Sequence, residues 1–130
     1  MKSPKIAVSW GELIDRITIL EIKLVQLSHQ DALANVEKEH KHLEDVYSRH
    51  ILGKDKVNEL FEELREINKR LWDIEDSLRE KERDKCFDQE FIELARSVYL
   101  TNDHRSRTKR RINEMLQSDL IEEKSYSTYR

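Results

Sequence analysis

Charged and polar side chains interrupt the apolar stripe of a predicted helix near the C-terminus, and their types suit them to chemistry. At 100° per residue, Asn102, Arg105 and Lys109 project from the same side of this helix as Phe91 and Val98. Apolar residues resume beyond the interruption, so a helix end that enters solvent does not account for it simply. Cations inside a packing stripe need anionic side chains or an anionic ligand.

Further polar residues lie on or beside other predicted packing stripes and extend this set into a layer. Glu21 and Glu75 are expected to neutralise the two cations through charge-assisted hydrogen bonds. The layer is a structural network that fixes the register of the helices, a pocket whose cations hold phosphate or carboxylate beside a proton-transferring acid, or an effect of the bundle end. The predicted site comprises Glu21, Asn68, Trp72, Glu75, Asn102, Arg105 and Lys109.

Composition and hydrophobic periodicity predict an all-α fold. Charged residues make up 39% and apolar residues 37% of the 130 residues, a balance typical of amphipathic helices. Helices are predicted over residues 10–27, from about 28–31 to the residue before Gly53, and over 56–83 and 88–117. The expected architecture is an elongated antiparallel bundle of three long helices plus one thinner outer helix, with short extended segments at both termini.

The chain is predicted to form a single domain over residues 1–130. The bundle occupies about residues 9–117, and a polar tail follows over 118–130, which Leu120, Ile121 and Tyr126 are expected to pin onto the bundle. Ser9 and Asp88 suit the N-cap positions of the first and last helices.

Charge and cysteine content narrow the function classes. A net charge of −3 argues against a dedicated nucleic-acid binder, and the basic run from Arg105 to Arg111 wraps around its helix instead of forming one face. Cys86 is the single cysteine, so the chain has neither an internal disulfide nor a cysteine-based zinc site. No apolar run approaches the ~20 residues that span a bilayer. We expect a cytoplasmic protein without metal, cofactor, membrane span or nucleic-acid partner.

One face of the third predicted helix combines aromatic and polar residues. Trp72 and the arginines among them are typical interface anchors. This face predicts a homodimer contact or, alternatively, packing against the last helix. The first helix is apolar over much of its circumference, so it is either central in the bundle or the dimer contact itself.

An acidic element on the third helix matches half of a metal-binding pattern. Glu62, Glu63 and Glu66 form an EExxE sequence like that of the all-α nucleotide pyrophosphohydrolases, whose carboxylates hold magnesium over a triphosphate. The ExxD element that should follow is missing, and the chain's ExxD, Glu12 to Asp15, lies upstream. Nucleotide pyrophosphohydrolase activity is therefore much less favoured than a role as an interaction protein or as a metabolite-binding protein.

Six segments are specific as a set: residues 10–23 (WGELIDRITILEIK), 71–76 (LWDIED), 91–99 (FIELARSVY), 101–103 (TND), 109–113 (KRRIN) and 122–126 (EEKSY). Together they resemble a small bacterial family of unknown function that occurs alone or beside glycosyltransferase and polysaccharide-synthesis proteins. The resemblance brings no catalytic residues. It implies one constellation formed by Asp15, Thr18, Glu21, Lys23, Trp72, Glu75, Asp76, Asn102, Asp103 and the Glu-Lys-Ser-Tyr tail.

Two functions follow from these observations, and the sequence leaves open whether the protein is an enzyme. The first is a non-catalytic accessory or interaction protein, homodimeric and linked to bacterial surface-polysaccharide synthesis, with a protein partner there. The alternative is a small enzyme or binding protein for a phosphorylated or carboxylated metabolite, such as a nucleotide or sugar nucleotide, held by Arg105 and Lys109. A concave, water-filled pocket lined by the charged groups of the layer would favour the alternative, whereas a closed layer in which every charge is paired would favour the interaction protein.

Overall fold

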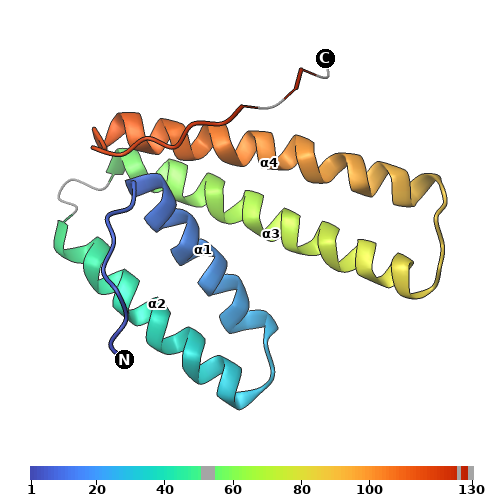
Figure 1. Ribbon diagram of the computed structural model, residues 1–130, viewed down its shortest axis with the longest axis horizontal. Coiled ribbons are helices and arrows are strands. Elements are labelled where there is room, and N and C mark those ends of the chain that lie inside the picture. Colours follow the sequence, from blue (N-terminus) through green and yellow to red (C-terminus); the bar gives the residue numbers. More distant parts are fainter. Residues whose placement is uncertain (51–54, 126, 129–130) are drawn as a thin grey trace.

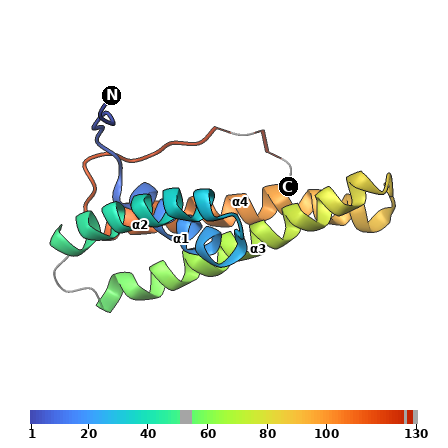
Figure 2. The ribbon, with the colours of Figure 1, turned by 90° about the horizontal axis from the view of Figure 1, so that it is seen from below.

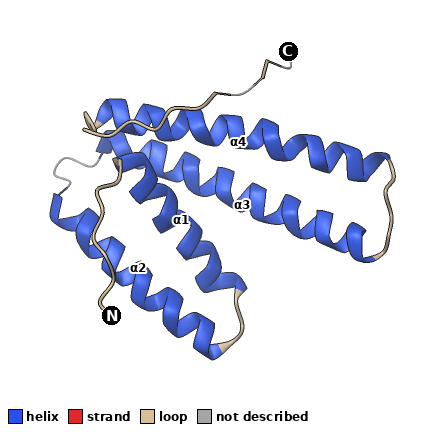
Figure 3. Cartoon of the chain, viewed as in Figure 1, coloured by secondary structure: helices blue, strands red, loops and turns tan. Residues whose placement is uncertain are grey.

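The computed structural model describes residues 1–50, 55–125 and 127–128 of the chain. It contains four helices, α1 (Trp10–Gln26), α2 (Gln30–His50), α3 (Asp55–Arg83) and α4 (Gln89–Met115). No strand occurs among the described residues (Figure 3). The predicted all-α fold class is confirmed.

The helices form two hairpins, α1–α2 and α3–α4, that meet at one end and diverge toward the other (Figures 1 and 2). α1 is the central helix, because it contacts α2, α3 and α4. Most of its apolar side chains are therefore covered within the chain, whereas Val25 near its end is 80% exposed. α2 lies outside and fully buries only Val36 and Tyr47 of its apolar side chains, as its thin stripe predicted for an outer helix.

The hydrophobic core lies where the two hairpins meet. Ile14 and Ile17 of α1 pack with Leu60 and Leu64 of α3 and with Ile112 of α4. Four of these side chains have no exposed surface, and Leu60 exposes 3%. Full burial of one aliphatic side chain contributes roughly 1.5–3 kcal/mol. This cluster fixes the first half of α1 against the C-terminal half of α4.

α1 and α4 begin after the predicted N-cap residues, whose side chains accept hydrogen bonds from the first helical turn. Ser9 Oγ accepts a hydrogen bond from the Glu12 amide at 3.1 Å, and Asp88 Oδ1 accepts one from the Phe91 amide at 3.0 Å. The Phe91 amide and the Lys81 ammonium lower the pKa of Asp88 to about 2. The Glu12 carboxylate turns toward α4 and binds a cation there.

The far half of the α3–α4 hairpin has no helix covering it (Figure 1). The fully buried residues of α3 end at Ile74, and those of α4 begin at Thr101. Beyond these points Phe87, Ile92 and Tyr99 expose 55%, 48% and 43% of their surfaces. Half of the longest hairpin is thus a two-helix projection with a partly exposed apolar surface.

The tail after α4 has no regular structure over its described residues and returns above α4 (Figures 1 and 2). Its start is fixed by the Ser118 amide, which donates to the Asn113 carbonyl at 2.8 Å. Leu120 and Ile121 expose 45% and 44% of their surfaces, so the predicted apolar attachment through them is wrong. Ion pairs attach the tail instead, as described below. The predicted tail anchor Tyr126 and the predicted C′ residue Gly53 lie outside the described residues.

Candidate functional site

A buried carboxylate stands at the junction of α1, α3 and α4. The side chain of Asp15 is only 2% exposed. Arg105 of α4 donates from Nε to Asp15 Oδ1 at 2.8 Å and from Nη2 to Asp15 Oδ2. This two-pronged pairing is the arrangement in which a guanidinium binds a carboxylate most strongly. The hydrogen bond that Arg105 donates to Asp15 raises the pKa of Arg105, which stays cationic despite its partial burial.

Side chains from α1 and α3 fix the orientation of Asp15. Asn68 Nδ2 donates to Asp15 Oδ1 at 2.9 Å and to Thr18 Oγ1 at 2.8 Å. Thr18 in turn donates to the Asp15 carbonyl at 2.8 Å. Because a buried polar group costs free energy unless it is hydrogen-bonded, this network stabilises one geometry of the three helices.

One turn further along α4, Lys109 forms ion pairs with three carboxylates. Its Nζ lies 2.8 Å from Glu12 Oε2, 2.9 Å from Glu122 Oε2 and 3.9 Å from Asp15 Oδ2. Burial opposes the charged form of this side chain, which is 10% exposed, but hydrogen bonds to Glu12 and Glu122 outweigh that effect and raise the pKa of Lys109. The ammonium group is therefore charged at neutral pH.

The short distance between α1 and α4 at this point depends on a glycine. The Gly11 amide donates to Asn113 Oδ1 at 2.7 Å. A Cβ atom built on Gly11 would lie 2.6 Å from the backbone carbonyl oxygen of Lys109, closer than real Cβ contacts permit. The missing side chain lets the two backbones meet and holds Glu12 beside Lys109.

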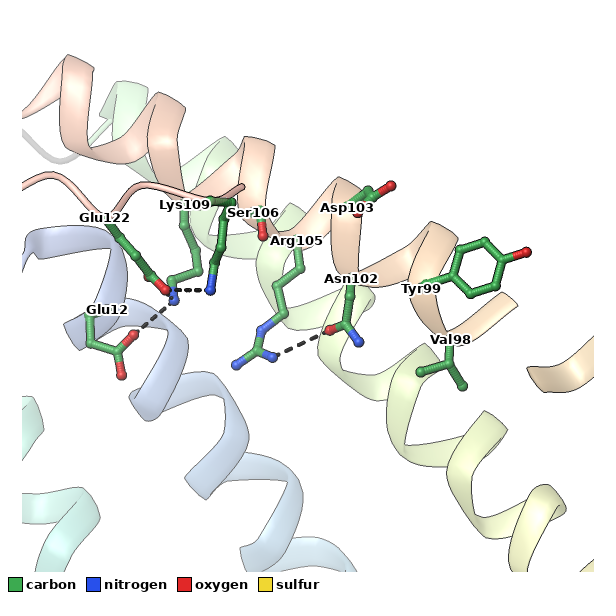
Figure 4. A pocket seen from close by; sticks show the side chains of 10 residues that line it. Glu12, Val98, Tyr99, Asn102, Asp103, Arg105, Ser106, Lys109 and Glu122 are labelled. Carbon is green, nitrogen blue, oxygen red and sulfur yellow. Dashed lines mark hydrogen bonds and ion pairs between the residues drawn. The ribbon is translucent and has the colours of Figure 1, made fainter. Parts of the chain in front are cut away.

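The two cations line an open pocket of about 680 Å³ between α1, α4 and the tail. In Figure 4, Arg105, Lys109 and Asn102 point from α4 toward the side on which α1 lies. The Arg105 Nη1 group faces Asn102 Oδ1 at 3.5 Å, while its Nε and Nη2 edge is taken by Asp15. The lining residues are Glu12, Val98, Tyr99, Asn102, Asp103, Arg105, Ser106, Lys109, Glu122 and Lys124.

The structure brings together part of the predicted site. Asn102, Arg105 and Lys109 line the pocket, and Asn68 supports it through Asp15. The predicted acidic partners of the two cations are wrong. Glu21 Oε2 accepts from Arg65 Nε at 2.6 Å.

Two further predicted residues stand apart on α3. Glu75 is exposed, and its Oε2 lies 3.8 Å from Arg79 Nη1. Trp72 is half-buried, and it lies past Leu71 on the part of α3 that leads to the uncovered hairpin. Neither residue lines the pocket.

Sequence periodicity missed the acids that pair with the cations, namely Asp15, Glu12 and Glu122. Asp15 lies off the main apolar stripe of α1, yet it is buried because three helices surround α1. Glu12 stands three residues after the N-cap Ser9, where a glutamate is typical of a capping box, so its position did not mark it as a partner for a cation. The family resemblance did contain a signal, since its motifs include all three acids and its expected constellation joins Asp15 to Asn102 and the tail.

The carboxylates of the EExxE element do not converge on one point. Glu63 Oε1 lies 2.8 Å from His104 Nε2, and Glu63 Oε2 lies 3.4 Å from Arg111 Nη1. Glu62 pairs with Arg65, while Glu66 is exposed. Within the described residues, no group of three His, Cys, Asp or Glu side chains is arranged to hold a metal ion.

The geometry defines a helical protein with an acid-anchored pair of cations facing a pocket. Residues 4–129 match a family of unknown function, DUF6165, and the chain belongs to this family. No curated protein and no solved structure matches the chain at a significant level. In the described part of the chain, no helix combines the length and apolar composition that crossing a bilayer requires.

Proposed function

We propose that the protein binds a small molecule carrying a phosphate or carboxylate group in the pocket between α1, α4 and the tail. The observation that carries this proposal is that both cations from the interrupted stripe of α4, Arg105 and Lys109, line that pocket. Its volume of about 680 Å³ falls in the range of small-molecule sites, roughly 300–1,000 Å³.

The anchoring of Arg105 favours recognition of an anion. Asp15, which Asn68 holds in place, binds the guanidinium from its buried edge, and 28% of the Arg105 side chain stays exposed. A preorganised donor loses little conformational entropy when a ligand binds, so more of its hydrogen-bond energy contributes to affinity. Asn102 and Ser106 add neutral polar groups, and Val98 and the ring of Tyr99 add apolar surface.

A sugar nucleotide or sugar phosphate combines the groups that this lining suits. Its phosphate complements Arg105 and Lys109, and its hydroxyls can donate to Asp103 and Asn102. A ring can pack on Tyr99. Such a ligand is compatible with the accessory role in bacterial surface-polysaccharide synthesis, which remains a prediction of the sequence resemblance.

The test is isothermal titration calorimetry of the full chain with UDP-glucose, glucose 1-phosphate and galacturonate. We expect at least one of these ligands to bind. Asn102→Ala and Tyr99→Ala should each lower the affinity for that ligand about fivefold, since losing one hydrogen bond or ring contact costs about 1 kcal/mol. Both side chains lie outside the core cluster, so the variants should melt close to the wild type.

Arg96→Ala provides the matched control, because Arg96 is exposed on the same helix and does not line the pocket. Its ligand affinity should equal that of the wild type. Absence of heat with all three ligands, or equal losses in Arg96→Ala and Asn102→Ala, would contradict the proposal.

A second role, as an interaction protein, is favoured by a separate observation. The far half of the α3–α4 hairpin buries no residue fully and exposes Phe87, Ile92 and Tyr99. Two packed helices alone leave much of their apolar stripes in water, and pairing with two more helices covers them. A second copy of the chain would supply such a pair.

A further inference from the structure

The tail places two adjacent carboxylates on two adjacent cations of α4. Glu122 Oε2 accepts from Lys109 Nζ at 2.9 Å, and Glu123 Oε2 accepts from Arg110 Nη1 at 3.0 Å. We call residues 118–125, which carry this pair, the C-terminal strap. Its two carboxylates therefore bind cations of two successive residues of one helix.

The contacts fall at the site described above. Glu122 and Lys124 of the strap line the main pocket beside Lys109. A smaller cavity of about 160 Å³ continues between the strap and α4, and its lining includes Lys109, Arg110, Glu122 and Glu123. The carboxylate pair therefore lies where the main pocket extends along α4.

The strap is attached mainly by charge. Leu120 and Ile121 are exposed, and Glu122 and Glu123 expose 38% and 73% of their side chains. Hydrogen bonds at Ser118 tie down its beginning, where Ser118 Oγ accepts from the Trp10 amide at 3.3 Å. Partly exposed ion pairs contribute little each and weaken with salt, so an anion in solution can replace them.

We propose that the Glu122–Glu123 pair is an internal stand-in for the diphosphate of the ligand, which displaces the strap and binds Lys109 and Arg110 in its place. This inference rests on the proposed function and narrows its ligand to molecules with two adjacent phosphoryl groups. The remainder of the ligand extends past Arg105 and Asn102 into the larger pocket.

The strap then acts as a tethered competitor. A segment joined to its site by a short chain has an effective concentration in the millimolar range, and it lowers the apparent affinity of any ligand that must displace it. Removing its two charges should strengthen binding of a diphosphate about tenfold or more. A single phosphate, which needs to displace only one carboxylate, should gain less.

The experiment compares the full-length wild type with E122Q/E123Q by calorimetry, using inorganic pyrophosphate, inorganic phosphate and UDP-glucose. The charge-matched control is E93Q/D119N, because Glu93 and Asp119 are exposed and line neither cavity. We expect pyrophosphate and UDP-glucose to bind E122Q/E123Q at least tenfold more tightly than the wild type and the control. The affinity for phosphate should increase clearly less than the affinity for pyrophosphate.

The outcomes separate the two proposals. If UDP-glucose binds the wild type and E122Q/E123Q equally, the strap inference is overturned and the proposed function stands. Equal gains for phosphate and pyrophosphate, or an equal gain in E93Q/D119N, would also overturn the inference, because general charge would then explain the effect. If none of the three probes binds any variant, the strap inference fails, and the proposed function fails with it only if glucose 1-phosphate and galacturonate also do not bind.

Discussion

At the scale of single residues, the Asp15–Arg105 pair decides whether the polar layer is structural, functional or both. Asp15 is nearly fully buried, and Arg105 donates two guanidinium hydrogen bonds to it. Breaking a buried pair from one side costs more than the pair contributes, because the remaining charge stays desolvated. The same arginine faces the pocket, so one residue holds the fold and presents a cation.

Arg105→Met should therefore lower the free energy of unfolding by about 3 kcal/mol, because Asp15 loses its main partner and Lys109 lies 3.9 Å away. Urea denaturation followed by circular dichroism measures the loss. Adding Asp15→Asn to this variant removes the unpaired charge and should restore much of the stability. A single variant as stable as the wild type would show that the pair is not structural.

Gly11→Ala should destabilise the protein, although alanine normally stabilises a helix by up to about 1 kcal/mol relative to glycine. The added Cβ would lie 2.6 Å from the Lys109 carbonyl oxygen and 3.0 Å from Asn113 Oδ1, so α1 and α4 must separate. Overpacking of this kind costs about 1–3 kcal/mol. A thermal melt should show a decrease of several degrees; an unchanged or higher melting temperature would mean that the two backbones separate at no cost.

Residue types revealed part of this site before the fold was known. Arg105 and Lys109 stood out because a cation within an apolar period is incompatible with ordinary packing. Asp15 did not, because a single stripe defines the buried side only for a helix covered on one face. The central position of α1 buries residues that the stripe assigns to solvent, and that position depends on the other three helices.

At the scale of elements, the strap should detach from α4 in acid. Lys124, and then Lys109, lower the pKa of Glu122 from 4.5 to about 2. Because Lys124 belongs to the strap itself, only the part of this shift that Lys109 causes stabilises the attachment to α4, and that part is lost as the pH falls from about 4.5 toward 2. Backbone heteronuclear NOE values of residues 118–125 should therefore fall between pH 6 and pH 2.

Glu122→Gln serves as the control for this titration, since its strap should give low NOE values at both pH values. Circular dichroism, recorded in parallel, establishes that the helices persist across the range. A wild-type strap that stays as rigid at pH 2 as at pH 6, with the helices intact, would contradict the electrostatic attachment.

Helix positions were easier to predict than their arrangement. The periodic stripes and the caps at Ser9 and Asp88 located all four helices, because both signals are local in the sequence. The divergence of the two hairpins was not predicted, since a stripe indicates which side of a helix is covered but not where its partner ends. The path of the strap has no periodicity, and charge alone does not determine which cation Glu122 meets.

At the scale of the whole molecule, the uncovered half of the α3–α4 hairpin predicts self-association. The face of α3 that meets α1 at Leu64 and Asn68 continues, with helical spacing, to Trp72. α1 does not follow it, because the hairpins diverge (Figure 1). Two such hairpins related by a two-fold axis would form a four-helix arrangement that covers both exposed surfaces.

Analytical ultracentrifugation of the full chain should therefore report a dimer at micromolar concentration. Ile92→Glu should weaken it at least tenfold, because a carboxylate buried in an apolar contact loses its hydration; Ile92 is 48% exposed within one chain, so the change should spare the monomer. Val25→Glu makes the same kind of change at a residue 80% exposed at the end of α1, away from the hairpin, and should leave the dimer intact. If the wild type stays monomeric at several hundred micromolar, the chain does not self-associate through the far hairpin. Equal losses of dimer affinity in the two variants would also show that the far hairpin is not the interface.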